Sequence, residues 1–249
     1  KATQFRSQAD HLVRKLSDIL RAAFVHSQAG QRPEALKSGF GALHDSVFDF
    51  SAMSRLVARN VPHDELPPQR RQRIEWALGV LRDQPFYPDP ARPGADATYG
   101  FVFSDCATAI EAHRTRLPKL VEVVKALAIA DLESRGGYVE ADHDAFFERF
   151  DEHALTADDL AQFPDYLVCI PPERNDAPDN AMLMEMLSAG MPVKVLVQHT
   201  DLLEEAAIGQ GHFAFGIRSA RLATTAMGLG GMFVFQSTVS NLYALRDRV

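Results

Sequence analysis

Cysteine is scarce in this chain: its 249 residues include only two, Cys106 and Cys169, which lie far apart in the sequence. Two cysteines cannot hold an iron–sulfur cluster by themselves, and these two do not form the paired pattern of a zinc site. Both lie in segments rich in apolar residues, and we interpret them as buried thiols of a reducing compartment. We therefore expect no iron–sulfur cluster within this chain, and a cytoplasmic location.

Basic residues are in the minority, and long apolar runs are missing. Lysine and arginine number 26 against 33 acidic residues, for a formal net charge of −7. Nucleic acid is disfavoured as a partner, because phosphate binding needs a basic footprint. No run is long and apolar enough to span a bilayer and no signal peptide is visible, so we expect no membrane partner. The segment Asn241–Val249 reads as a helix without a stop signal, so we expect a truncated C-terminal end.

Recognisable catalytic motifs are absent. The sequence has no Gly-x-Ser-x-Gly motif and no cysteine–histidine pair in a known setting, so no catalytic residue is assigned. Gly228–Gly231 follows a helical segment and precedes an apolar run, which predicts a helix end and not a phosphate loop. His199 and His212 flank a predicted loop after a strand, where a histidine is more often structural than functional.

Two short charged clusters are candidate sites. Acidic residues and one histidine crowd together between residues 140 and 148: Glu140, Asp142, His143, Asp144 and Glu148. Metal sites use such ligands, but residues one or two apart do not share a helix face, so the pattern favours a solvated acidic turn. Three arginines, Arg70, Arg71 and Arg73, form a small basic face, which we interpret as the solvated start of a helix.

The first 98 residues are predicted to be helical. His11–Phe24 carries apolar residues at helical spacing, and Ser46–Arg59 is a second helix candidate. A third helix opens at Pro67-Pro68, and its apolar stripe is Ile74, Ala77, Leu78 and Leu81. The proline-rich stretch from Pro85 to Gly94 reads as a linker. We therefore place a domain boundary there, between residues 1–98 and 99–249.

More helices are expected after the linker. Ser104 or Asp105 is a candidate cap for a helix that runs toward Arg116. A new helix is expected near Pro118, ending at Gly136-Gly137. Two short helices follow, at Ala145–Phe150 and at Thr156–Phe163, the latter capped by Thr156.

The remaining part alternates between strand and helix patterns. Tyr166–Ile170, Val193–Val197 and Met232–Phe235 are short apolar runs, and Ala181–Ala189 is helix-forming. This alternation predicts parallel strands joined by crossover helices. The expected class is α/β, with a helical N-terminal part packed on a mostly parallel sheet. Because ligands of such sheets bind at the carboxyl ends of the strands, residues 171–180 and 198–211 are the loops where a site is expected.

The last part of the chain resembles a known family. Leu187–Asp201 reads LSAGMPVKVLVQHTD, and Ser219–Ser237 reads SARLATTAMGLGGMFVFQS. Both segments are similar to the thiamine-diphosphate-binding domain of pyruvate:ferredoxin oxidoreductase and related 2-oxoacid:ferredoxin oxidoreductases, and a thinner similarity begins at Phe101–Cys106. The resemblance covers roughly Tyr99–Val249 and implies a thiamine-diphosphate-binding-like fold.

The resemblance also implies an activity, cofactors and partners. In the family, a 2-oxoacid is oxidatively decarboxylated through a thiamine ylid, with thiamine diphosphate and Mg²⁺ as cofactors. The electrons pass to iron–sulfur clusters, which other segments must hold here. By resemblance, the partners are other domains or subunits of an oxidoreductase assembly, in a homo- or hetero-oligomer.

Only some of the family's site residues have counterparts. Thr200 matches a threonine that binds magnesium, Leu202 matches a carbonyl donor, and His199 lies beside them. The family also has a Gly-Asp-Gly motif, whose aspartate binds magnesium. That aspartate aligns with Pro172, which has no side-chain oxygen. The carboxylates nearest to that position in the sequence are Glu173 and Asp176, with Asp179 beyond them. The candidate cofactor residues are thus Thr200, Leu202, Glu173, Asp176 and His199, and the candidate metal ligands are Thr200, Glu173 and Asp176.

The region of the diphosphate is also altered. Glu204-Glu205 stands where the cofactor's diphosphate would lie, and the two carboxylates would repel it. Two hypotheses follow from this. The first is a domain of a 2-oxoacid:ferredoxin oxidoreductase-like protein with a degenerate cofactor site. The second is a non-catalytic structural or interaction domain that keeps the fold and has lost thiamine diphosphate and Mg²⁺, and the altered residues favour that loss.

Overall fold

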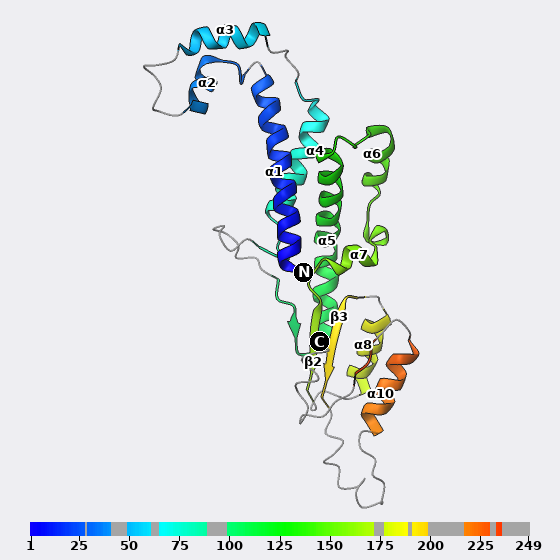
Figure 1. Ribbon diagram of the computed structural model, residues 1–249. Coiled ribbons are helices and arrows are strands. Elements are labelled where there is room, and N and C mark those ends of the chain that lie inside the picture. Colours follow the sequence, from blue (N-terminus) through cyan, green and yellow to red (C-terminus); the bar gives the residue numbers. More distant parts are fainter. Residues whose placement is uncertain are drawn as a thin grey trace, which may run out of the picture. The chain divides into compact units, whose positions relative to one another are not determined.

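The computed structural model shows a mixed helix and strand protein (Figure 1). It describes residues 1–27, 29–40, 49–60, 65–88, 99–171, 177–188, 191–198, 217–229 and 233–235. The chain separates into two compact units. The first unit combines Lys1–Ala97 with Lys119–Leu155, and the second combines Thr98–Pro118 with Thr156–Val249. Residues 119–155, which we expected in the α/β part, therefore cluster with the N-terminal helices.

The first unit is helical. Its elements are α1 (Ala2–His26), α2 (Pro33–Phe40), α3 (Phe50–Asn60), α4 (Pro68–Arg82), the larger part of α5 (Cys106–Ser134), α6 (Glu140–Glu148) and the short 3₁₀ helix η2 (Glu152–Ala154). Helix α1 packs against α4, and α2 packs against α3 (Figure 1). The buried face of α1 consists of Phe5, Ala9, Leu12 and Leu16, which are three or four residues apart and so lie on one side of the helix.

The predicted apolar stripe of the third helix is confirmed. Ile74, Ala77, Leu78 and Leu81 of α4 are all buried, and the helix begins at Pro68. Proline suits the first helical position, because its missing N–H would have no intrahelical partner there. Each large aliphatic side chain buried in this way stabilises the fold by about 1.5–3 kcal/mol.

The second unit is built on a small parallel sheet. The strand order is β1 (Val102–Phe103), β2 (Tyr166–Ile170), β3 (Val193–Val197), and both neighbouring pairs are parallel. Helix α8 (Ala177–Ser188) connects β2 to β3, and α7 (Ala157–Ala161) and α10 (Ile217–Gly228) complete the described elements. The predicted α/β class and the predicted parallel pairing of 166–170 with 193–197 are therefore confirmed.

The core of the second unit lies on one face of β2. Tyr166, Val168 and Ile170 alternate along the strand and are at most 3% exposed. They pack with Leu183 and Met186 of α8, and the first turns of α5 add Cys106 and Ala109. Cys106 is thus buried as expected, whereas Cys169, on the opposite face of β2, is only partly buried; neither cysteine forms a disulfide.

Two expectations about the strands are corrected. Phe233–Phe235, the described part of the third apolar run, belongs to no strand, and Phe233 is 74% exposed. A strand that was not expected forms instead at Val102–Phe103, paired with Leu167 and Val168. This strand has only two residues, too few for any alternation to show in the sequence.

The expected break at Pro118 does not occur. A single helix, α5, runs from Cys106 to Ser134 with Pro118 inside it. Of the two predicted cap candidates, Ser104 and Asp105, it is Asp105 that caps the helix: its Oδ1 accepts a hydrogen bond of 2.8 Å from the backbone N–H of Thr108. An internal proline lacks the N–H that would bond to the carbonyl four residues earlier. The helix continues because apolar residues are buried on both sides of the proline, and the two compact units divide the helix at this residue.

The predicted helix ends agree with the structure in two other places. Gly136 follows the end of α5 with a φ of +66°, a left-handed conformation that glycine adopts without strain. Thr156 caps α7: its hydroxyl accepts from the N–H of Asp159, whose carboxylate accepts from the N–H of Thr156. Among the described residues, no helix combines the length and the apolar character needed to cross a membrane.

Replacement of Gly30 by alanine is expected to lower the free energy of unfolding by about 1–3 kcal/mol, the usual cost of forcing extra atoms into a packed site. A Cβ atom at this position would overlap the backbone carbonyl oxygen of Phe24. That carbonyl cannot easily move, because it accepts hydrogen bonds from the N–H and the hydroxyl of Ser27. The loss is measured by urea denaturation followed by far-UV circular dichroism.

Gly79→Ala is the matched control for Gly30→Ala. Gly79 lies on the exposed side of α4, and no atom lies within 4 Å of a Cβ built there. The same substitution should therefore stabilise the protein by about 0.5–1 kcal/mol, because alanine favours the helix more than glycine does. Equal effects of the two substitutions would contradict the packing described around Gly30.

Candidate functional site

The carboxyl ends of β2 and β3 lie side by side, as a site at the strand ends requires. Ile170 pairs with Val197, and the backbone N–H of Gln198 donates to the carbonyl of Ile170 at 3.0 Å. The candidate cofactor and metal residues follow these strands in the sequence. Glu173, Asp176, His199, Thr200 and Leu202 all lie outside the described residues, as does Pro172.

The described residues that directly follow the strands do not fit a magnesium diphosphate. Pro171 and Gln198 carry no carboxylate, and magnesium prefers charged oxygen ligands. Asp105, which follows β1, does carry one, but its Oδ1 already accepts from the N–H and the hydroxyl of Thr108, each at 2.8 Å. Within the part of the chain that the structure describes, no group of three or more His, Cys, Asp and Glu side chains is placed to hold a metal ion.

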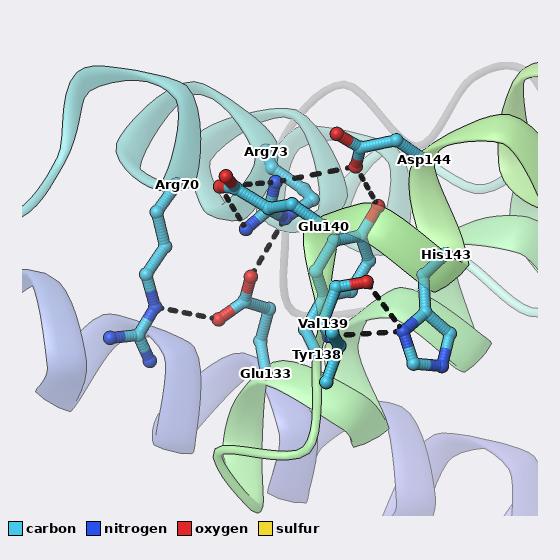
Figure 2. Close-up of polar contacts among 8 residues, drawn as sticks. All are labelled: Arg70, Arg73, Glu133, Tyr138, Val139, Glu140, His143 and Asp144. Carbon is cyan, nitrogen blue, oxygen red and sulfur yellow. Dashed lines mark hydrogen bonds and ion pairs between the residues drawn. The ribbon is translucent and has the colours of Figure 1, made fainter.

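A cluster of charged residues lies instead in the first unit, around the buried side chain of Glu133 (Figure 2). The Glu133 side chain is only 1% exposed. Its Oε2 accepts from Nε of Arg70 at 2.8 Å and its Oε1 accepts from Nε of Arg73 at 2.7 Å. Two arginines from α4 thus share one carboxylate from α5, and these strong charge-assisted hydrogen bonds offset the cost of burying it. We call Arg70, Arg73 and Glu133 the arginine–glutamate cluster.

Arg73 makes further contacts at its outer side. Its guanidinium lies 3.7 Å from the centre of the Tyr138 ring, a cation–π contact. Its Nη atoms approach Glu140 at 3.5 Å and Asp144 at 3.8 Å. Burial works against the Arg73 cation, but the hydrogen bond and charge of Glu133 outweigh it, so the pKa of Arg73 is raised. The residue therefore stays charged.

Tyr138 is fixed from two sides. Its hydroxyl donates to Oδ1 of Asp144 at 2.7 Å, and its ring is stacked with that of Phe147 at a centroid distance of 6.0 Å. Burial and the hydrogen bond to Asp144 raise the pKa of Tyr138 to about 12. The phenol is therefore neutral and acts as a hydrogen-bond donor near neutral pH. A pocket of about 210 Å³ opens beside it, lined by Arg70, Arg73, Glu133, Gly136, Tyr138 and Glu140.

The acidic cluster at 140–148 is a helix and not a turn. Helix α6 begins at Glu140, five residues before the expected start, with Glu140 and Asp142 in its first turn, where carboxylates interact favourably with the helix dipole. Four of the five residues are exposed as expected, and Nδ1 of His143 lies 2.9 Å from the backbone oxygen of Val139. Glu140 and Asp144 are not simply solvated, however, because both approach Arg73.

The arginines do lie at the start of a helix, as expected, since α4 begins at Pro68, but the expectation that Arg73 is solvated is wrong. The side chain of Arg73 is only 13% exposed, and that of Arg70 is 35% exposed. The sequence did carry a signal for this cluster. Arg70 and Arg73 lie three or four residues from the apolar positions of α4, and Glu133 lies three residues after Ala130, on the buried side of α5. Charged residues on the inner face of two helices are expected to pair.

Comparisons with known proteins yield no relative: no protein-family model, no curated protein and no solved structure matches the chain.

Proposed function

We propose that this chain is an α/β domain, with attached helices, of a 2-oxoacid:ferredoxin oxidoreductase-like protein, and that its thiamine diphosphate site is degenerate. The observation that carries the proposal is the unit formed by β2, α8 and β3. Two parallel strands are joined by a helix, in the order that the resemblance implies for this part of the chain. The similar segment Leu187–Asp201 includes the end of α8 and the whole of β3.

The position of the strand ends supports a site at residues 171–176 and 198–202. Ile170 and Val197 are paired, so the chain leaves both strands at one edge of the sheet. Ligands of parallel sheets bind at this edge. Thr200 and Leu202, the counterparts of two family ligands, come within four residues after Gln198 in the sequence, and Pro172 aligns with the family's aspartate.

The proposed partners and location follow from the same resemblance. When bound, thiamine diphosphate supplies the ylid that attacks a 2-oxoacid in the enzymes that this chain resembles. Electrons from such a reaction would need iron–sulfur clusters on other domains or subunits, because this chain has two cysteines. We therefore propose a cytoplasmic homo- or hetero-oligomer of which this chain is one part.

A second candidate is a structural or interaction domain without cofactor. The observation that favours it is the donor set at the strand ends, where Pro172 replaces the family's aspartate, Pro171 replaces a glycine, and Asp105 is engaged as a helix cap. The two candidates differ in a measurable way. The first requires that the scaffold can still accept thiamine diphosphate once its carboxylate is restored, and the second does not.

Restoring the Gly-Asp-Gly motif is the test. The variant Pro171→Gly/Pro172→Asp/Glu173→Gly should bind thiamine diphosphate with Mg²⁺ at least about tenfold more tightly than the natural chain, a difference of about 1.4 kcal/mol. The reason is that magnesium needs charged oxygen ligands, and the restored aspartate and Thr200 are the counterparts of the family's metal-binding side chains. Isothermal titration calorimetry with thiamine diphosphate measures the affinity, with and without Mg²⁺.

The control adds Thr200→Ala to the restored variant, which should abolish the gain. If the restored chain is folded by circular dichroism and shows no Mg²⁺-dependent gain, the resemblance does not describe this site and the second candidate remains. If the natural chain already binds thiamine diphosphate at micromolar concentration, the site is functional and not degenerate.

A further inference from the structure

The pocket beside the arginine–glutamate cluster has unused cationic donors. Nε of Arg70 bonds to Glu133, but within the described part of the chain its two Nη atoms make no hydrogen bond or ion pair. The Arg70 side chain is 35% exposed and lines the pocket. An arginine fork with free Nη atoms can bind a carboxylate or a phosphate with two parallel hydrogen bonds.

The charged groups around the pocket differ in their burial and in the length of their contacts. The buried part, Arg70, Arg73 and Glu133, has two positive charges and one negative charge. The excess positive charge is covered by Glu140 and Asp144, whose side chains are 48% and 58% exposed. Their distances to Arg73, 3.5 and 3.8 Å, exceed the roughly 2.7–2.9 Å of a strong charge-assisted hydrogen bond. Glu140 therefore forms only a weak ion pair with Arg73, and a bound anion could take the place of the Glu140 carboxylate.

Both guanidinium groups are held in place before any ligand arrives. Glu133 fixes the Nε atoms of Arg70 and Arg73, and the guanidinium of Arg73 lies over the ring of Tyr138, 3.7 Å from its centre (Figure 2). A ligand would not have to order these long side chains, so little conformational entropy is lost on binding. The volume of about 210 Å³ admits a small molecule and not a macromolecular segment.

We propose that this pocket binds a small oxyanion, a carboxylate or a phosphate, which contacts the Nη atoms of Arg70 and displaces Glu140 from Arg73. Glu140 then acts as an internal competitor for the site. The cluster belongs to the first unit, and the strand-end loops belong to the second. The proposal therefore stands independently of the proposed thiamine diphosphate site.

The test is an anion titration at constant ionic strength. Inorganic phosphate and malonate serve as probes of the two anion types, and the Nε–Hε resonances of Arg70 and Arg73 are followed by NMR. Saturable shifts of these resonances are expected with at least one probe. Glu140→Gln should strengthen binding about tenfold, because it removes the competing carboxylate while leaving the buried cluster intact. A response to phosphate alone or to malonate alone identifies the type of anion.

Two further substitutions make the result specific. Arg70→Lys keeps the positive charge but loses the fork, so it should weaken binding about tenfold or more. Arg71→Ala removes a charge from the same helix at a position that does not line the pocket, and should leave binding unchanged. Equal losses in both variants would mean general attraction to surface charge and would overturn the proposal. The absence of saturable binding by both the natural chain and Glu140→Gln would overturn it as well.

Discussion

Replacement of Glu133 by alanine is expected to lower the free energy of unfolding by about 3 kcal/mol or more, the range measured when one partner of a buried ion pair is removed. The substitution leaves Arg73, whose side chain is 13% exposed, without its carboxylate partner. It also releases Arg70 and opens a cavity on the inner face of α5. Urea denaturation measures the loss, and hydrogen exchange should show it in α4 and in the part of α5 after Pro118.

Most of this loss is the cost of an unpaired cation and not the strength of the ion pair itself. Glu140 and Asp144 cannot replace Glu133, because they lie 3.5 and 3.8 Å from Arg73 and their side chains are 48% and 58% exposed. Glu133→Gln should therefore be less damaging than Glu133→Ala: it keeps the volume and two hydrogen-bonding atoms but loses the charge. The expected order of stability is natural chain, Glu133→Gln, Glu133→Ala.

Glu122→Ala is the matched control on the same helix. Glu122 also forms an ion pair, with Lys119 at 2.7 Å, but the two side chains are 37% and 31% exposed. A pair in contact with water contributes only about 0.2–1 kcal/mol, so this control should be nearly neutral. If Glu133→Ala lowers the free energy of unfolding no more than Glu122→Ala does, the buried carboxylate matters no more for stability than an exposed one. The description of the arginine–glutamate cluster would then be wrong.

Local patterns predicted those elements whose stability depends on residues close in sequence. The stripe at 74–81 and the cap at Thr156 are examples, because an apolar face or a cap is complete within a few turns. The pairing of β2 with β3 was predictable because both are apolar runs joined by one helix. Strand β1 was missed because its pairing with β2 connects residues more than sixty positions apart.

The same limit explains the candidate sites. The hydrogen bond from Arg70 to Glu133 spans 63 residues, so the arginines appeared to be a surface feature when only their own helix was considered. Pro118 was read as a boundary because proline normally costs a helix about 3 kcal/mol. Tertiary burial on both sides of it overrides that local cost. The predicted cofactor residues, Thr200 among them, lie outside the described residues and stay a prediction.

The second large effect is expected at Tyr166, at the start of β2. The residue is 2% exposed and its ring contacts three others: Phe101 at 5.1 Å, Phe103 at 5.8 Å and His113 at 5.4 Å between ring centres. Arg116 lies 5.7 Å from the same ring. The side chain therefore joins β2 to α5 and to the segment that contains β1.

Tyr166→Ala should lower the free energy of unfolding by about 3–5 kcal/mol, as for other large aromatic residues removed from a core. Part of the loss comes from the cavity and part from the ring contacts, which are worth about 0.5–1.5 kcal/mol each beyond their buried area. Hydrogen exchange should rise in β2 and β3, whereas α4, in the other unit, should keep its protection. This pattern is opposite to the one expected for Glu133→Ala.

Tyr166→Phe separates the ring from its hydroxyl. Burial raises the pKa of Tyr166, and the positive charge of Arg116 opposes that rise, so the phenol is neutral near physiological pH. Because Arg116 also donates to the carbonyl of Gly100 at 2.7 Å, it keeps a partner without the hydroxyl. The phenylalanine variant should therefore lose about 1 kcal/mol or less, the net value of one hydrogen bond. A loss as large as that of Tyr166→Ala would show that the hydroxyl, and not the packing of the ring, holds β1 and β2 to α5.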